Sequence, residues 1–230
     1  MRDMVIERTK YQSRMAATPE DLRAAQVLRH RAFHGQVIGP DLDRDAFDDR
    51  CSHILVEEAN TGRLVSCFRM LHLTRGSEIE RTYSAQFYEL SALHQFDAPM
   101  VEMGRFCIDP ACHDVDVLRV AWAAMTRYVD DHGVEMLFGC SSFKGTDANP
   151  YFDAFAMLKE RHLAPRRWGP RVKAPAVFRF AERLRRRKPA AKQAMAGMPP
   201  LLRTYLMRRG WGSDHAVVDT HMTTLHVFTG

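Results

Sequence analysis

Apolar residues recur at helical spacing after two helix-start signals in the chain. Thr18 precedes a proline and two acidic residues, a combination typical of a capped helix N-terminus, and Gly35 stops the pattern. The apolar positions between them are Leu22, Ala25, Leu28, Ala32 and Phe33. A stronger apolar stripe begins after Asp114, which can act as its N-cap, and Gly133 ends it. The pattern therefore predicts two amphipathic helices.

Short apolar runs bounded by turn residues predict the strands. Residues 53–57 and 64–71 flank an Asn-Thr-Gly turn at 60–62, which is typical of a β-hairpin. The runs 100–108 and 135–141 predict two further strands, the second of them buried. Strands and helices therefore alternate through the middle of the chain, which favours an α/β (α+β) protein.

The remaining predicted elements are shorter. In chain order they are a short helix at 84–93, a helix at 149–161, apolar spacing at 199–207, and strands at 215–219 and 225–228. No internal repeat is visible, and 230 residues fit one large domain. We therefore expect residues 1–230 to form a single domain.

The composition is that of a reduced globular protein. Hydrophobic residues make up 46% of the chain, enough for a sizeable core, yet no apolar run is long enough to span a membrane. The N-terminal sequence lacks the apolar stretch of a secretory signal, so a cytoplasmic location is expected. The five cysteines are odd in number and include no C-x-x-C pair, which argues against a disulfide framework. Cys107, Cys112 and His113 are close in sequence, but a fourth ligand has no obvious source, so no metal site is expected.

Charge is distributed unevenly. Residues 161–210 hold fifteen Lys and Arg but a single acid, Glu182, so this segment carries +14 and the rest of the chain −9. Its proline- and arginine-rich part, residues 165–200, is expected to be an excursion from the core. Within it, residues 177–187 can form a basic amphipathic helix that lies on an anionic membrane or packs on the core. Such a segment favours an anionic partner.

The strand at 100–108 carries the most unusual chemistry. Its central residues Glu102, Met103, Gly104 and Arg105 place an acid, a glycine and a base inside an apolar run. Charged groups in a central strand are costly unless they are paired or functional. In a regular strand Glu102 and Arg105 would point to opposite faces, but a bulge at Gly104 would direct both to one site. The alternative is a structural salt bridge at a sheet edge.

Residues upstream of this strand form an ordered set with it. They are Asp45 and Asp48 on either side of Phe47, then Arg69 and Phe87. The set resembles the acyl-homoserine-lactone synthases, relatives of the GNAT acetyltransferases that take acyl groups from acyl carrier protein. The tryptophan expected before the D-x-F-D motif is missing, and Val37 or Ile38 stands there instead.

Nearly the whole chain, and its second half above all, is similar to a sister family, the bacterial ornithine N-acyltransferases. The similarity rests on residues 11–33 and on FGCSSFKGTD (138–147), RHLAP (161–165), MPPLLRTYL (198–206) and VVDTHMTTLHVF (217–228). It implies a GNAT-like acyl-CoA N-acyltransferase fold, with a central mixed twisted sheet flanked by helices. It also implies transfer of a 3-hydroxyacyl group from acyl carrier protein to the α-amine of ornithine, giving lyso-ornithine lipid without a cofactor.

The segment after the strand bears on the acyl donor. GNAT enzymes that use coenzyme A hold its pyrophosphate with a glycine-rich loop at a helix N-terminus. Residues 110–116 read PACHDVD, which lacks those glycines and contains two aspartates that would repel a pyrophosphate. A carrier-protein donor presents a single phosphodiester there. Carrier proteins are also acidic, which suits the basic segment 161–210.

Amine acylation assigns expected roles to the charged residues. Glu102 is the candidate to bind or deprotonate the amine, and a backbone N–H near Arg105 to polarise the thioester carbonyl. Arg105 itself would bind the substrate carboxylate or hold the acidic loop that contains Asp45 and Asp48. Asp45 and Asp48 would accept hydrogen bonds from the ornithine amines or make local turns. Arg69 would order them, contact the substrate or form a cross-strand ion pair.

Further candidates complete the expected site. His53, at the entrance of a strand, is an alternative proton acceptor or a structural histidine. The resemblance places Phe87 among the substrate-binding residues. The acyl and pantetheine channel candidates are Phe106, Cys107, Ser141, Ser142 and Lys144. A simple turn at the last three, and buried packing at Cys107, are the alternatives.

Three other functions stay open. The chain fits an acyl-homoserine-lactone synthase that uses S-adenosylmethionine, or a non-catalytic domain that retains the acyltransferase fold. A nucleic-acid-binding protein would use residues 161–210, but that segment lacks interleaved aromatic residues and any nucleic-acid motif, so we expect no nucleic-acid partner.

An acylated product would bring the protein to the surface of the inner membrane.

Overall fold

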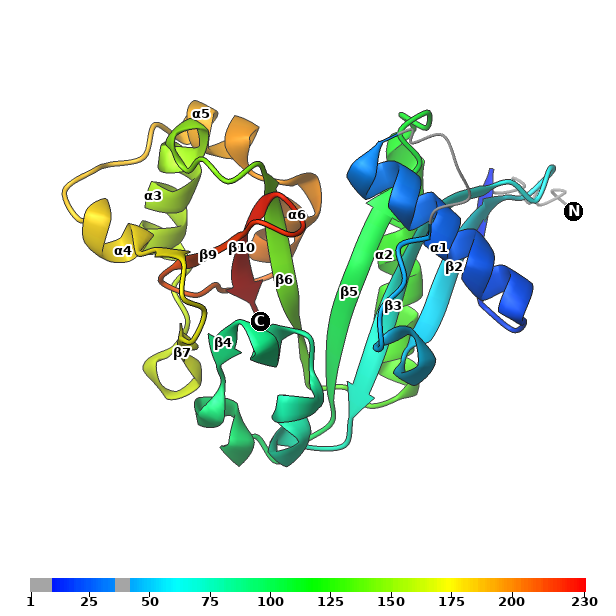
Figure 1. Ribbon diagram of the computed structural model, residues 1–230, viewed down its shortest axis with the longest axis horizontal. Helices are drawn as coiled ribbons and strands as arrows, with labels where there is room; N and C mark the ends of the chain where they lie inside the picture. Colours follow the sequence, from blue (N-terminus) through cyan, green and yellow to red (C-terminus); the bar gives the residue numbers. More distant parts are fainter. Residues whose placement is uncertain (1–9, 36–41) are drawn as a thin grey trace, which may run out of the picture. The chain divides into compact units, whose positions relative to one another are not determined.

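The computed structural model describes residues 10–35 and 42–230, which form two compact units (Figure 1). Unit 1 comprises the described chain up to Leu71 together with Gly104–His132. Unit 2 comprises His72–Met103 together with Gly133–Gly230. The strand β5 (Met100–Ile108) contributes its first half to unit 2 and its second half to unit 1.

Unit 1 is a layer of antiparallel strands with flanking helices. Its elements are β1 (Tyr11–Met15), α1 (Pro19–His34), the 3₁₀ turn η1 (Asp48–Arg50), β2 (Ser52–Glu58), β3 (Leu64–Leu73, whose last two residues belong to unit 2) and α2 (Val115–Asp131). β2 pairs antiparallel with both β1 and β3, and β3 neighbours β5. α1 buries Ala25 and Leu28 in a cluster with Leu55 of β2 and Cys67 of β3, which fixes the helix on the strands.

α1 and α2 begin where their capping residues predict. At the start of α1, Thr18 Oγ1 accepts the Asp21 N–H at 3.2 Å and the Asp21 carboxylate accepts the Thr18 N–H at 3.3 Å. This reciprocal pair is a capping box. At the start of α2, the Asp114 carboxylate accepts the Asp116 N–H at 3.0 Å. Both predicted helices are therefore confirmed.

Unit 2 combines a mixed sheet with short helices. Its elements are η2 (Gly76–Arg81), η3 (Ser84–Gln86), β4 (Tyr88–Glu89), η4 (Ser91–Gln95), β6 (Met136–Lys144), η5 (Asn149–Tyr151), α3 (Phe152–Arg161), η6 (Arg166–Trp168), β7 (Arg171–Val172), β8 (Val177–Phe178), α4 (Phe180–Arg183), α5 (Ala191–Gly197), α6 (Pro200–Met207), β9 (Ala216–Asp219) and β10 (Thr224–Thr229). β5 pairs parallel with β6, whereas β6 with β10, β10 with β9 and β9 with β8 are antiparallel. The predicted mixed sheet flanked by helices is confirmed.

The core of unit 2 lies between α3 and the sheet. Phe155 of α3 packs on Phe143 of β6, with ring centroids 4.8 Å apart, and Leu225 and Val227 of β10 belong to the same cluster. Because successive strand residues point to opposite faces, His226 lies on the face of the sheet away from α3. That opposite face carries the polar residues described below.

The expected helix at 84–93 is absent. Tyr88 and Glu89 are extended and pair with Val172 and Arg171 of β7, between the 3₁₀ turns η3 and η4. A helix cannot continue through two extended residues. The strand with which Tyr88 and Glu89 pair, β7, is distant in sequence. The local apolar pattern therefore could not show this pairing.

The expected basic amphipathic helix at 177–187 is wrong. Val177 and Phe178 form β8, which pairs with Val217 and Ala216 of β9, and the helix that follows, α4, spans only Phe180–Arg183. The strand pairing takes up Val177, the first residue of the expected apolar face. Its remaining large side chains are buried in the core of unit 2. Within the described chain, no helix is long and apolar enough to cross a bilayer.

Candidate active site

β5 leaves regular strand geometry between Glu102 and Arg105. The parallel ladder with β6 runs from Met100 to Met103, which lies opposite Gly139. A Cβ on Gly139 would collide with the Met103 carbonyl oxygen, so this close pairing requires glycine. The φ of Arg105 is 53°, in the left-handed region that non-glycine residues rarely adopt, whereas Gly104 is not among the residues with positive φ. The strand is thus irregular one residue later than the predicted bulge.

Arginines and aspartates of unit 1 form a charge-balanced network. Its members are Arg29 of α1, Arg69 of β3, Arg105 of β5, and Asp43, Asp45 and Asp48 of the acidic loop. Asp48 Oδ1 accepts hydrogen bonds from Arg29 Nη1 at 2.7 Å and from Arg69 Nη1 at 2.7 Å. Asp48 Oδ2 also accepts the Gln26 amide at 3.0 Å. The interior of the network is therefore centred on Asp48.

The outer part of the network is centred on Asp45. Arg69 holds it bidentately, at 2.5 Å to Oδ1 and 2.8 Å to Oδ2, and Arg105 Nη2 donates to Oδ2 at 3.1 Å. Arg105 Nε also donates to Asp43 Oδ1 at 3.3 Å. The Asp45 side chain is 23% exposed and that of Asp48 only 1%. Asp45 is thus the aspartate of this pair that solvent or a substrate reaches.

Charge pairing keeps both aspartates ionised. Burial alone would raise the pKa of Asp48, but hydrogen bonds and charge from Arg29, joined by Gln26 and Arg69, outweigh burial and hold it well below its usual range. The pKa of Asp45 is likewise lowered, because Arg69 and Arg105 outweigh the effect of burial. The network therefore ties the acidic loop to α1, β3 and β5 with its charges balanced.

Arg29 is a member of this network that sequence reasoning missed. It lies four residues after Ala25, on the buried face of α1, and its side chain is 1% exposed. The available signal was a charged residue inside the apolar stripe of a helix, because a buried arginine requires acidic partners. The position of the missing tryptophan, at Val37 or Ile38, lies outside the described residues.

His53 supports the acidic loop. Its Nε2 lies 3.0 Å from the Asp48 backbone oxygen, and it stands opposite Arg69 in the pairing of β2 with β3. Burial lowers the pKa of His53, and the charges of Arg29 and Arg69 lower it further. A neutral ring with its proton on Nε2 donates to that carbonyl, which favours the structural alternative for this residue.

Glu102 is held at the start of η3 in unit 2. Its Oε2 accepts the Tyr83 N–H at 2.8 Å and its Oε1 accepts the Ser84 N–H at 2.7 Å, and the residue is 5% exposed. Glu102 lies opposite Phe138 of β6, so both side chains are on one face of the sheet. Ser84 Oγ lies 3.4 Å from Cys140 Sγ. The two N–H groups fix the orientation of the carboxylate.

Phe87 and His226 lie at the other end of the η3 segment. Their rings meet edge to face, with centroids 4.9 Å apart. The Tyr88 hydroxyl donates to the His226 backbone oxygen at 2.7 Å, and its own oxygen lies 3.1 Å from Nδ1. Because the hydroxyl has one proton, Nδ1–H is the donor, and Nε2 is unprotonated, buried and without a partner among the described residues. Burial lowers the pKa of His226 to about 4.

The channel candidates of β5, Phe106 and Cys107, contact neighbouring side chains in unit 1. Phe106 contacts Phe68, with ring centroids 6.0 Å apart. Cys107 is 5% exposed, and its Sγ lies 3.6 Å from Cys67 Sγ. This contact, together with burial, raises the pKa of the Cys107 thiol well above its usual value. A protonated buried thiol is a poor nucleophile, which argues against an acyl-cysteine step.

The channel candidates of β6 belong to unit 2. Ser141 Oγ lies 3.1 Å from Thr229 Oγ1 of β10, whereas Ser142 and Lys144 are exposed. Ser142 stands directly opposite His226 in the antiparallel pairing, so the two side chains share one face of the sheet. β6 therefore presents an exposed hydroxyl and an exposed ammonium group along its second half.

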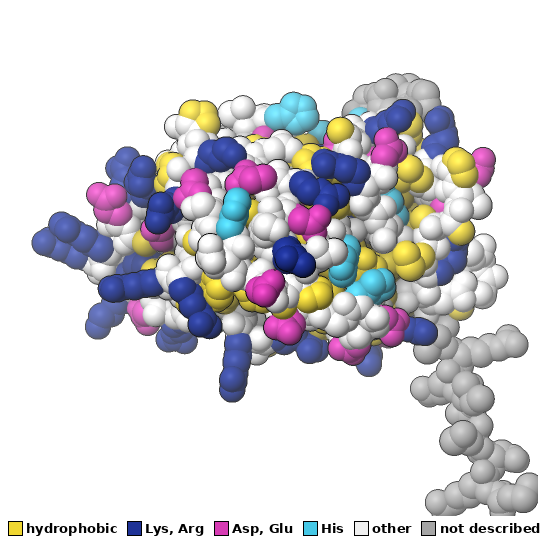
Figure 2. Space-filling model, turned by 90° about the horizontal axis from the view of Figure 1, so that it is seen from below, with side chains coloured by type: hydrophobic (Ala, Val, Ile, Leu, Met, Phe, Trp, Pro, Cys, Tyr) yellow, Lys and Arg dark blue, Asp and Glu magenta, His cyan; other side chains and the backbone are white. Residues whose placement is uncertain are grey.

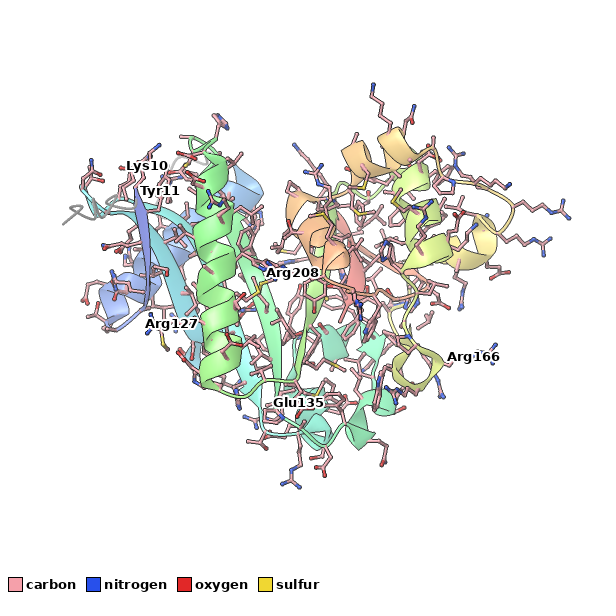
Figure 3. All side chains as sticks on the ribbon, turned by 180° about the vertical axis from the view of Figure 1, so that it is seen from behind. Lys10, Tyr11, Arg127, Glu135, Arg166 and Arg208 are labelled. Atoms are coloured by element: carbon pink, nitrogen blue, oxygen red, sulfur yellow. The ribbon has the colours of Figure 1, made fainter. Side chains whose placement is uncertain are left out.

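The N-terminus of α2 is occupied by a side chain of the protein itself. Asp114 caps the helix, and its Oδ2 lies 2.5 Å from Lys10 Nζ and 3.2 Å from the Tyr11 hydroxyl. Lys10 and Tyr11, both labelled in Figure 3, lie at the start of β1 in unit 1. Lys10 and the Asp116 N–H hold the pKa of Asp114 below its usual value. A carboxylate thus takes the place where a helix would otherwise attract an anion.

Comparisons with known proteins agree with this architecture. Residues 28–123 match the family described as an acetyltransferase (GNAT) domain. The solved AHL synthase LasI is 20% identical over 57% of this chain and 72% of that one, with a TM-score of 0.39. The L-ornithine N(alpha)-acyltransferase of Rhizobium meliloti is 27% identical, over 94% of this chain and 78% of that protein. That of Rhodobacter capsulatus is 30% identical, over 94% of this chain and 88% of that protein. The chain therefore belongs to the L-ornithine N(alpha)-acyltransferase family and has the GNAT acyltransferase fold.

Proposed function

We propose that the protein transfers a (3-hydroxy)fatty acyl group from acyl carrier protein to the α-amine of ornithine, giving lyso-ornithine lipid. The observation that carries the proposal is the similarity to the L-ornithine N(alpha)-acyltransferase of Rhodobacter capsulatus over 94% of this chain. The match extends beyond the part shared with acetyltransferases in general, residues 28–123. This extent favours a common substrate as well as a common fold.

In this reaction the neutral α-amine attacks the thioester carbonyl. A C–N bond forms, the carbonyl oxygen becomes an oxyanion, and collapse of the tetrahedral intermediate breaks the C–S bond. We assign Glu102 to accept the amine proton, directly or through one water, and the proton ends on the departing pantetheine thiol. The bonds from Tyr83 and Ser84 N–H support this role, because they hold the carboxylate in one orientation.

The charge network supplies the proposed acceptor contacts. Asp45 and Arg105 are its more exposed members, at 23% and 12% of their side chains, so we assign them to the ammonium and carboxylate groups of ornithine. Asp48 and Arg69 are almost fully buried and, with His53, position the loop rather than contact substrate. Phe87 remains a proposed substrate contact.

Acyl carrier protein is the proposed donor for a reason of charge. The Asp114 carboxylate at the N-terminus of α2 would repel the pyrophosphate of coenzyme A, whereas a carrier protein presents one phosphodiester. Ser141, Ser142 and Lys144 of β6 are proposed to line the pantetheine arm. No protein-bound cofactor or metal is required by this chemistry.

The cytoplasmic location and a peripheral contact with the inner membrane stay predictions. The lipid product favours such a contact. The short α4 removes the amphipathic helix that was expected to make it, because Phe180 and Leu184 are buried in the core. A membrane contact would then depend on exposed cations rather than on inserted apolar side chains.

Purified protein, 3-hydroxyacyl carrier protein and a panel of amines test the proposed function. We expect mass spectrometry to detect acylated ornithine with the wild type. Glu102→Gln should reduce the rate at least about 100-fold, because it removes the base. Glu135→Gln, an exposed position labelled in Figure 3, is the matched control and should leave the rate unchanged. Formation of an acyl-homoserine lactone from S-adenosylmethionine, with ornithine untouched, would contradict the proposal.

A further inference from the structure

The last residue of α4 and the segment that follows it in unit 2 form an exposed basic turn. We define the basic turn as Arg183, Arg185, Arg186 and Lys188, all of which are exposed. Within the described ranges 10–35 and 42–230, none of these four side chains forms an ion pair. Figure 2 shows Lys and Arg side chains gathered at the left, where Figure 1 draws α4. The turn thus presents four exposed positive charges that form no ion pair with the described part of the chain.

Two residues of α3 fasten this turn. Lys159 Nζ donates to the backbone oxygens of Leu184 and Arg187, each at 2.9 Å, and lies 3.4 Å from that of Arg185. Asp153 accepts Arg187 Nη2 at 2.9 Å and the Ala190 N–H at 3.1 Å. Lys159 is therefore a fifth cation beside the four of the basic turn. Its ammonium group is repelled by them, and the backbone carbonyl oxygens that it contacts offset this repulsion. The turn is held in one shape although its charges would spread it.

We propose that the basic turn is the surface on which the acidic acyl carrier protein docks. This inference rests on the proposed function, which requires such a donor. The guanidinium forks of Arg185 and Arg186 suit bidentate contact with carboxylates. Because the backbone is already fastened by Lys159 and Asp153, less conformational entropy is lost when a partner binds.

The packing around the turn favours a protein partner over a membrane or a nucleic acid. The large apolar side chains next to it, Phe180 and Leu184, are 0% and 7% exposed, so they do not project into lipid. The four residues of the turn include no aromatic ring on which a base could stack. Charge is what the turn offers, and a carrier protein is the acidic macromolecule that the reaction brings to this enzyme.

Charge reversal tests the docking surface. Arg185→Glu/Arg186→Glu is compared with Arg119→Glu/Arg127→Glu, which makes the same charge change on α2 at side chains that are 81% and 83% exposed. At low salt we expect the KM of the first variant for acyl carrier protein to be at least about tenfold higher than that of the wild type. The Kd of its complex with acyl carrier protein, measured by fluorescence anisotropy, should rise by the same factor. Its kcat, its KM for ornithine and its rate with an S-acyl-pantetheine donor should equal those of the wild type. The control variant should change none of these quantities.

The outcomes separate docking from the proposed function. An unchanged Kd for the carrier protein in the turn variant overturns the docking surface, whatever the activity. Loss of binding to phosphatidylglycerol vesicles with the Kd for carrier protein unchanged also overturns it, and assigns the turn to the membrane. A wild type that acylates ornithine from neither donor refutes the proposed function instead, while the anisotropy measurement still decides the docking.

Discussion

Asp48 holds the charge network of unit 1 together, because two arginines donate to the same carboxylate oxygen. Arg29 and Arg69 each lie 2.7 Å from Asp48 Oδ1, and all three side chains are at most 4% exposed. Removing one partner of a buried ion pair leaves an uncompensated charge, which typically costs about 3–5 kcal/mol. The buried aspartate and its more exposed neighbour Asp45 should therefore respond differently to the same substitution.

We expect Asp48→Asn to lower the free energy of unfolding by about 3 kcal/mol, because Arg29 and Arg69 lose their shared anion. Asp45→Asn should cost less stability, since its side chain is 23% exposed, but should raise the KM for ornithine. Urea unfolding and steady-state kinetics of both variants measure these effects. Equal unfolding midpoints for the two variants would show that Asp48 is not the structural centre.

The buried His226 should make stability depend on pH. Its pKa is about 4 when folded, against an ordinary value of about 6.5, so between these values the unfolded chain binds more protons than the folded one. The contribution of the neutral His226 to the free energy of unfolding is fully present above pH 6.5. It is lost as the pH falls towards 4, by about 3 kcal/mol in total. His226→Asn does not titrate, so its urea-unfolding free energy should fall less between pH 6.5 and 4.5. Parallel curves for the two proteins would refute the assignment.

At the scale of single residues, the sequence predicted which charged residues lie together better than it predicted their backbone conformation. Asp45, Asp48, Arg69 and Arg105 were expected to act together, and the structure brings them into one network. The left-handed backbone of Arg105 was not predictable, because such a conformation is rare for non-glycine residues and is imposed by the surrounding structure. The roles of these residues in catalysis stay predictions.

At the scale of elements, the N-terminus of α2 makes a prediction about the acyl donor. Asp114→Asn keeps a side-chain cap on the helix and removes the negative charge. A charge near a phosphate is worth about 1 kcal/mol in water, so kcat/KM with acyl-CoA should rise about fivefold relative to acyl carrier protein. Kinetics with both donors measure this ratio. An unchanged ratio would show that Asp114 does not discriminate between them.

Local signals predicted some elements and could not predict others. The capping box at Thr18 and the cap at Asp114 depend on residues within one turn, so α1 and α2 begin where the sequence places them. The segment 177–187 has helical periodicity, but the edge of β9 is available to Val177 and Phe178, and strand pairing overrides the local preference. The same reason explains Tyr88 and Glu89, whose partner strand is β7.

At the scale of the whole molecule, the predicted fold and family are confirmed, and the charge asymmetry is refined. The sequence showed that residues 161–210 carry +14. It could not show that Arg187 pairs with Asp153 while Arg186 and Lys188 form no ion pair with any described residue, because that depends on how the segment packs on α3. The expectation of a single domain remains a prediction.

The most direct test of the central claim uses two blocked forms of ornithine. Nδ-acetyl-ornithine has a free α-amine and Nα-acetyl-ornithine a free δ-amine, and each is offered with 3-hydroxyacyl carrier protein to the purified protein. We predict that mass spectrometry finds an acylated product from Nδ-acetyl-ornithine and none from Nα-acetyl-ornithine. Acylation of Nα-acetyl-ornithine, or of neither compound while free ornithine is also untouched, would contradict the assignment of an α-amine acyltransferase.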